Sequence, residues 1–270
     1  MKAMNLLSFT VIAGVLSAVV FSVFKGMGIG VFLNADALVI VIGGTVVGMF
    51  LAFPIDRIKN TVKDIIQSFR ENTERNELVA EIIECAVVNR TKGIRELEEM
   101  TEGNVKDDFL RFGLTLVVNN HSERAIREIM DREMTDRMVN LNFSQNVLKT
   151  ISRLTPSLGL TGTVISLIKL FKNFDSIDAL APLMAVALMS TFYGVVLANL
   201  IALPLSAKLR DYALTSESLM NVTIEGVVAI SSMEHPSKIE ERLSRYEDID
   251  EIIYSKNNYD KALAFGETSR

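Results

Sequence analysis

The sequence has little of what most enzymes use for chemistry. Among its 270 residues there are one cysteine, two histidines and no tryptophan. Cys85 lies in a helical stripe of apolar residues, and neither His121 nor His235 has a partner at a metal-ligand spacing. The formal net charge of −5 gives no sign of a nucleic-acid-binding surface. We therefore predict a protein that is not an enzyme, binds no nucleic acid and holds no cofactor.

Apolar residues are concentrated in four uninterrupted runs, although 23% of all residues are charged. The runs cover residues 5–24, 37–53, 154–171 and 180–203. Each has about the 17–25 residues that cross the hydrocarbon core of a bilayer as a helix. No Asp or Glu lies within the runs, and the one Lys, Lys169, is close to the end of the third. The sequence therefore predicts four transmembrane helices.

Basic residues beside these runs favour one orientation. Arg57 and Lys59 follow the second run, Arg153 precedes the third, and Lys208 and Arg210 follow the fourth. Because basic residues gather on the cytoplasmic side, both termini are expected in the cytoplasm. Apolar residues at three- and four-residue steps predict helices in the intervening segment and in the tail, so the fold class is all-α. The expected organisation is a membrane hairpin at 1–53, a cytoplasmic helical domain at 54–149, a second hairpin at 150–205, and cytoplasmic helices with a tail at 206–270.

Small and hydroxyl residues recur at helical spacing in the third and fourth runs. Pro156, Gly159, Thr163 and Ser166 share one helix face, and Ala187, Thr191, Gly194 and Ala198 share another. One interpretation is close helix packing, with the threonine hydroxyls bonded to their own helix. The other is that Thr163 and Thr191 line a path for a small cation, since hard ions prefer oxygen ligands. Such a path needs a carboxylate from another chain, because the runs contain none.

Several motifs, in order, resemble those of the MotA/PomA family, the ring-forming subunits of flagellar stators. They are "VIVIGGT", Phe53-Pro54, "TPSLGLTGTVISL", "AVALMSTFYGVVLAN" and "LPLSAKL". The resemblance, from about residue 5 to residue 245, implies a homopentamer in the bacterial inner membrane. It also implies two partner chains of the MotB/PomB type that supply the missing aspartate, and torque on a rotor switch protein of the FliG type.

The resemblance also assigns roles to individual residues. The family's two membrane prolines, linked to conformational change during ion passage, fall on Pro156 and Pro204, and its charged pair for rotor contact falls on Arg90 and Glu98. On a straight helix these two charges are about 80° apart, and Gly93 is expected to break the helix between them.

Thr163 and Thr191 match the sodium-driven members, so they are the expected ligands of a transported sodium ion, with the proton as the alternative. Two other interpretations remain. One is an energiser of the ExbB/TolQ type, a family that usually has three membrane helices with the N-terminus outside. The other is a purely structural membrane scaffold.

Overall fold

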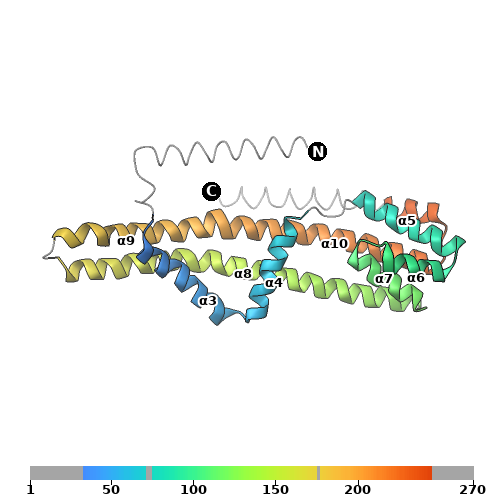
Figure 1. The fold of residues 1–270 in the computed structure, drawn as a ribbon, viewed down its shortest axis with the longest axis horizontal. Coiled ribbons are helices and arrows are strands. Elements are labelled where there is room, and N and C mark those ends of the chain that lie inside the picture. Colours follow the sequence, from blue (N-terminus) through green and yellow to red (C-terminus); the bar gives the residue numbers. More distant parts are fainter. Residues whose placement is uncertain (1–32, 71–74, 175–176, 245–270) are drawn as a thin grey trace, which may run out of the picture. The chain divides into compact units, whose positions relative to one another are not determined.

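A computed structural model describes residues 33–70, 75–174 and 177–244 of the chain. Every regular element in these ranges is a helix, which confirms the prediction of an all-α protein (Figure 1). The first apolar run, 5–24, lies outside the described residues. Contacts divide the chain into two compact units. Unit 1 contains the described residues 33–54 and 148–204, and unit 2 contains the described residues 55–147 and 205–244.

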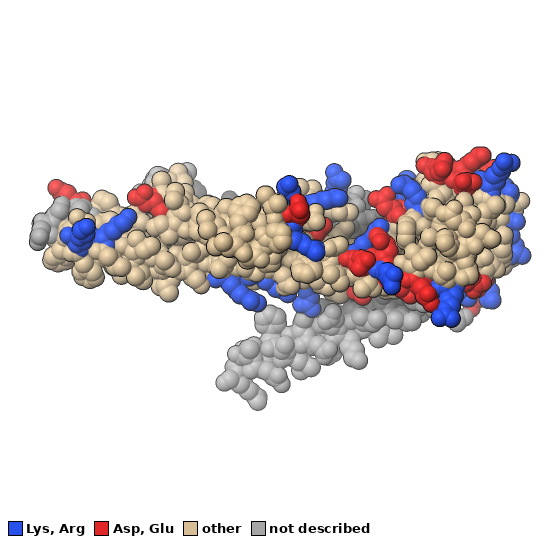
Figure 2. Space-filling model, turned by 90° about the horizontal axis from the view of Figure 1, so that it is seen from below, with Lys and Arg blue, Asp and Glu red and all other residues tan. Residues whose placement is uncertain are grey.

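Three helices in the described part of the chain are long and apolar enough to cross a membrane. They are Ala35–Ala52, Glu123–Lys172 and Leu180–Ser231. They contain the second predicted run except its last residue, Phe53, and all of the third and fourth. On the face shown in Figure 2, acidic and basic side chains gather over unit 2, whereas the surface of unit 1 carries few of them. This segregation of charge is the pattern expected when one unit faces lipid and the other faces water.

The first of these apolar helices is built from three consecutive elements: α2 (Ala35–Leu38), the π-helix η2 (Val39–Gly43) and α3 (Gly44–Ala52). The side chain of Asn34 caps its start by accepting a hydrogen bond from the Ala37 backbone N–H at 3.0 Å. The helix ends at Ala52 because Phe53 precedes a proline, which favours the extended conformation that Phe53 adopts (φ −136°, ψ 142°).

Two long helical segments continue from one unit into the other. Helix α8 (Glu123–Lys172) is a single helix of 50 residues with Pro156 inside it. Helix α9 (Ile177–Val196) passes through the π-helix η3 (Leu197–Ala202) into α10 (Leu203–Ser231). The sequence predicts membrane runs that end near residues 171 and 203, followed after the fourth run by cytoplasmic helices. Helix α8 ends at Lys172, and α10 extends from Leu203 into the segment predicted as cytoplasmic helices.

Unit 2 is a helical domain with its own hydrophobic core. Around parts of α8 and α10 it adds α4 (Ile55–Ser68), α5 (Arg75–Thr91), α6 (Ile94–Gly103), α7 (Asp108–Val118) and a helix at 236–244. The largest fully buried side chains include Leu78, Ile82, Leu110, Leu114, Ile126, Met130, Ile224, Ile230 and Ile239. Cys85 belongs to this core: it is fully buried, and burial raises the pKa of its thiol to about 12, so it is not a reactive cysteine.

The break between α5 and α6 occurs where the sequence predicts it. Gly93 has φ 89° and ψ 178°, a backbone conformation that is open essentially only to glycine. Helix α5 therefore stops at Thr91 and α6 starts at Ile94, which confirms that Gly93 separates Arg90 from Glu98.

Candidate ion pathway

Helices α8 and α9 come into close contact in unit 1. A Cβ at Gly159 would lie 2.7 Å from the Ser190 carbonyl oxygen and 3.2 Å from the Thr191 Cα. A Cβ at Gly194 would lie 2.6 Å from the Thr155 carbonyl oxygen. Real side chains do not approach a backbone this closely, so both positions require glycine. Small residues thus bring the two backbones together, as they commonly do between membrane helices.

The residues that fill this contact are not all the ones that the spacing indicated. The buried small and hydroxyl residues are Thr155, Gly159, Gly162 and Ser166 on α8, and Ala187, Ser190, Gly194 and Ala198 on α9 and η3. Pro156 and Thr163 are only partly buried, and Thr191 is exposed. At these three positions the buried residue is therefore the one directly before the predicted residue in the sequence. The side chains of Thr163 and Thr191 are therefore not fully buried between the helices, although the Thr191 backbone lies at the contact.

The hydroxyl groups of the two candidate threonines have different environments. The Thr163 hydroxyl donates to the carbonyl oxygen of Leu160 in its own helix at 2.6 Å. This is the bond expected of an ordinary threonine in a membrane helix. The Thr191 hydroxyl has no hydrogen-bond partner among the described residues. The Thr191 hydroxyl, on an exposed face of α9, is therefore uncommitted, meaning that it makes no hydrogen bond within the described residues. The Thr163 hydroxyl already donates its proton within its own helix.

The two candidate prolines lie in different settings. Pro156 is at the helix contact, because a Cβ at Gly194 would lie 3.2 Å from the Pro156 Cα. The hydroxyls of Thr155 and Ser157, on either side of it, donate to the carbonyl oxygens of Ile151 and Arg153. Such bonds help a proline-containing turn to stay helical.

Pro204 is exposed in the first turn of α10, directly after η3. A proline cannot donate a backbone hydrogen bond and collides with the carbonyl of residue i−4. The wider π-helical turn that precedes Pro204 is a common way for a helix to accommodate such a disturbance, and it is frequent at functional sites.

Tyr193, which the sequence analysis did not single out, joins this region to the start of the second span. Its hydroxyl accepts a hydrogen bond from the Asn34 backbone N–H at 3.0 Å. Asn34 is also the residue that caps α2, so the contact fixes the start of this helix against α9. Tyr193 is two residues from Thr191, and its position in "TFYG" beside the candidate threonine is the signal that could have identified it.

Carboxylates are scarce in the described part of unit 1. Only Asp36 and Asp178 occur, each in the first turn of its helix. No cluster of three or more metal-ligating side chains is present in the described ranges of either unit. Any cation on this face of α9 therefore meets hydroxyl and carbonyl oxygens without a balancing charge from the described helices.

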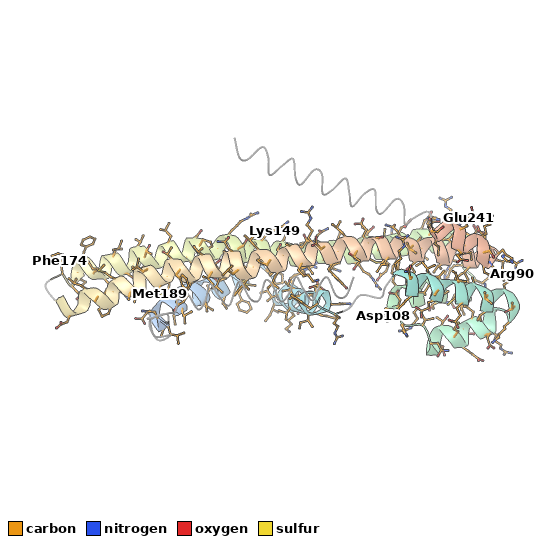
Figure 3. The ribbon with its side chains drawn as sticks, turned by 90° about the horizontal axis from the view of Figure 1, so that it is seen from above. Arg90, Asp108, Lys149, Phe174, Met189 and Glu241 are labelled. Carbon is orange, nitrogen blue, oxygen red and sulfur yellow. The ribbon has the colours of Figure 1, made fainter. Side chains whose placement is uncertain are left out.

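Arg90 and Glu98 are both exposed in unit 2, and they do not contact each other. Arg90, at the end of α5 in Figure 3, donates to the carbonyl oxygen of Met233 at 2.9 Å. Met233 follows the end of α10 and has a positive φ of 55°, so Arg90 also supports this turn. Glu98, on α6, has no hydrogen bond or ion pair within the described ranges. Of the two, only Glu98 has a side chain free of such an intramolecular role.

Comparison with known proteins identifies the family. Residues 101–221 match the model of the MotA/TolQ/ExbB proton channel family. Motility protein A of Bacillus subtilis (strain 168) is 30% identical over 226 residues, which are 83% of this chain and 83% of that protein. The chain belongs to the MotA/TolQ/ExbB proton channel family. Its membership makes it a channel-type membrane protein, and the family description is not that of an enzyme.

Within the MotA/TolQ/ExbB family, the similarity extends over nearly the whole chain. The chemotaxis protein PomA of Vibrio alginolyticus is 27% identical over 247 residues, covering 90% of this chain and 95% of PomA. The solved structure of the flagellar MotAB stator complex from Bacillus subtilis contains a similar chain with a TM-score of 0.73 and 28% identity, covering 86% of this chain and 93% of that one. The fold is therefore that of a MotA chain.

Proposed function

We propose that this chain is the ion-conducting ring subunit of a flagellar stator and that sodium is its coupling ion. Five copies surround two partner chains of the MotB/PomB type in the bacterial inner membrane, with both termini in the cytoplasm. Inward flow of sodium past the partner's aspartate turns the ring and drives the rotor. Family membership supports the stator part of this proposal, and the similarity to a solved MotAB stator complex points to the same kind of partner.

The observation that carries the ion-path assignment is the exposed, uncommitted hydroxyl of Thr191. A hydroxyl on the exposed surface of a membrane helix is costly in lipid unless another chain or an ion covers it. A partly dehydrated sodium ion must regain several oxygen ligands, which Thr191, Thr163 and backbone carbonyls can supply. The missing negative charge comes from the partner, because the described spans have carboxylates only in the first turns of their helices.

A proton-driven stator is the second candidate. It is favoured by the description of the family as proton channels and by the name motility protein A of several relatives. A proton needs the partner's carboxylate and a chain of water, but it does not need two threonine hydroxyls. The threonine pattern is therefore the feature that favours sodium over the proton.

The proposed rotor contact involves Arg90 and Glu98 at the exposed end of unit 2. Complementary charges on a rotor switch protein of the FliG type would fix the register of the two surfaces more than they add affinity. Pro156 lies against Gly194 and next to the turn that carries Thr191, so ion occupancy there can change the α8–α9 contact. Pro204 is the second place where the helix geometry can change.

The stator proposal is tested by expressing the chain with the MotB-like protein from its own genome in a motile bacterium that lacks its stators. We expect restored swimming and a purified complex whose native mass corresponds to five copies of this chain and two of the partner. A complex with an energising partner of outer-membrane receptors, and no recovery of swimming, would instead support an ExbB/TolQ-type function. Failure to bind any partner while inserting normally would support a structural scaffold.

A further inference from the structure

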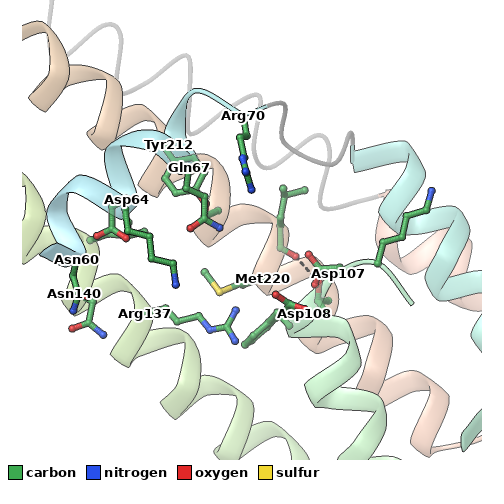
Figure 4. A pocket seen from close by; sticks show the side chains of 17 residues that line it. Asn60, Asp64, Gln67, Arg70, Asp107, Asp108, Arg137, Asn140, Tyr212 and Met220 are labelled. Carbon is green, nitrogen blue, oxygen red and sulfur yellow. Dashed lines mark hydrogen bonds between the residues drawn. The ribbon is translucent and has the colours of Figure 1, made fainter. Parts of the chain in front are cut away.

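Unit 2 contains a cavity that the stator function does not use. Its volume is about 600 Å³, within the range of ligand sites for small molecules. It is bounded by α4, the start of α7, α8 and α10, and all its lining residues belong to unit 2. Figure 4 shows that charged side chains reach into this space from several helices. The charged side chains of such a cavity need counter-charges, either from the chain or from a ligand.

The acidic residues of the cavity are already committed to partners in the chain. Asp107 caps α7 by accepting a hydrogen bond from the Leu110 N–H at 2.7 Å. Asp108 forms an ion pair with Arg111 at 3.1 Å. Asp64 accepts a hydrogen bond from the Ser144 hydroxyl at 2.6 Å. None of the three carboxylates forms an ion pair with the cations that line the cavity.

The cations of the cavity are less fully neutralised. Lys63 and Arg70, both on or next to α4, form no ion pair with any described residue. Arg137 on α8 binds Glu133 at 2.8 Å through its Nε, and its guanidinium lies over the Phe109 ring. In Figure 4, Arg70 and Arg137 direct their guanidinium groups into the cavity from opposite sides. The lining holds four cations, Lys63, Arg70, Lys106 and Arg137, and three carboxylates, and Lys63 interacts electrostatically with Asp64. The formal excess of charge in the lining is therefore one positive charge.

The rest of the lining suits an organic group more than a bare ion. Met220 and Leu219 on α10 and Leu141 on α8 supply apolar surface, and Tyr212 on α10 adds an aromatic ring to the lining. An aromatic ring provides a surface on which a planar base can stack. Several cations line the cavity, and two of them are guanidinium groups. A guanidinium group can bind two phosphate oxygens at once.

We propose that this cavity binds a soluble, phosphate-bearing ligand of nucleotide size. Its phosphates contact Lys63, Arg70 and Arg137, and its base lies against Tyr212 and Met220. Phosphate groups on membrane lipids share this chemistry, so the experiment must separate the two sources. The proposal is independent of the coupling ion, and it stands or fails separately from the stator function.

The test is binding of ATP, GTP and pyrophosphate to the purified complex in nanodiscs that contain phosphatidylglycerol, measured by calorimetry. We expect at least one of the two nucleotides to bind more tightly than pyrophosphate. Changing Arg70→Gln or Lys63→Gln should each weaken binding about tenfold, the loss expected for one charge-assisted contact. Arg132→Gln removes an exposed charge from α8 outside the cavity and should leave binding unchanged. Asp64→Asn should strengthen it, because it removes a negative charge from the lining.

Three results would overturn the proposal. Absence of binding by all three probes would show that the cavity takes no soluble phosphate ligand. Equal weakening by Arg132→Gln and Arg70→Gln would show that binding depends only on overall charge. Binding in phosphatidylcholine nanodiscs that disappears with phosphatidylglycerol would assign the site to a lipid headgroup instead. Melting temperatures that are not lower than that of the wild type serve as the control for folding of the variants.

Discussion

Replacing Gly194 with alanine tests the α8–α9 contact on which the proposed ion path depends. The added methyl carbon would lie 2.6 Å from the Thr155 carbonyl oxygen and 3.2 Å from the Cα atoms of both Gly159 and Pro156. All three are backbone atoms of α8, so no side-chain rotation relieves the contact. Helix α9 must therefore move by roughly 0.5–1 Å to restore ordinary van der Waals distances. This displacement also moves Thr191, which is one turn away.

The expected loss of stability follows from two opposing terms. Overpacking of this kind costs about 1–3 kcal/mol, and replacing a helical glycine by alanine regains up to about 1 kcal/mol. The net loss of about 1–2 kcal/mol corresponds to a melting temperature lower by about 2–8 °C for a chain of roughly this size. The measurement is thermal unfolding of the detergent-solubilised protein by circular dichroism, together with swimming speed.

A matched control is available in the same unit. Gly43→Ala also adds a methyl group to a membrane helix, but among the described residues only its own helix comes within 4 Å of the added carbon. We expect its melting temperature to stay unchanged or to rise slightly. If Gly194→Ala unfolds at the wild-type temperature and supports wild-type swimming, the close α8–α9 contact is not a feature of the working protein.

Three further predictions concern Tyr193, Asp64 and Glu98. Tyr193→Phe removes the acceptor of the Asn34 N–H, so we expect a lower melting temperature and a higher external sodium concentration for half-maximal motor speed. An unchanged sodium dependence would leave Tyr193 a purely structural residue. Burial raises the pKa of Asp64 above its ordinary value, and the Ser144 hydrogen bond and the charge of Lys63 oppose this shift. The folded protein therefore favours the protonated carboxyl. Its contribution to stability is complete below the unfolded pKa and is lost as the pH rises through the folded pKa. Asp64→Asn should therefore raise the melting temperature at pH 7.5 and lose its advantage toward pH 4, and a gain independent of pH would contradict this. Glu98→Lys should reduce torque without changing stability, and a reversed charge on the rotor should restore the torque. Glu99 is exposed on the same helix, and Glu99→Lys should leave the torque unchanged.

The features that could be predicted from sequence are those that depend on neighbours along the chain. Apolar length identified the second, third and fourth spans, and the pre-proline position of Phe53 marks the end of the second. Gly93 was predicted to break a helix, and its backbone conformation is one that other residues avoid. In each case the deciding physics lies within a few residues.

The seam between α8 and α9 could be predicted only in part. The steps of three and four residues that placed Pro156, Gly159, Thr163 and Ser166 on one face are met equally well by Thr155, Gly159, Gly162 and Ser166. The two stripes share Gly159 and Ser166, so periodicity cannot choose between them. The contact uses the stripe that contains a second glycine, because that stripe allows the backbones to approach more closely.

Contacts between distant segments could not be predicted. The bond between Tyr193 and Asn34 joins residues 159 positions apart. The cavity of unit 2 combines Lys63, Asp107, Arg137 and Tyr212, which lie on or beside four different helices. One sequence without its fold contains no signal that these side chains meet.

The proposed sodium path is tested most directly by the speed of single flagellar motors driven by this chain with its own partner, measured against external sodium at a fixed proton-motive force. We expect that speed rises with sodium and saturates, that Thr191→Ala abolishes rotation, and that Thr163→Ala weakens the sodium dependence. Full speed in sodium-free potassium buffer, lost only when a protonophore is added, would contradict the sodium path and leave a proton-driven stator.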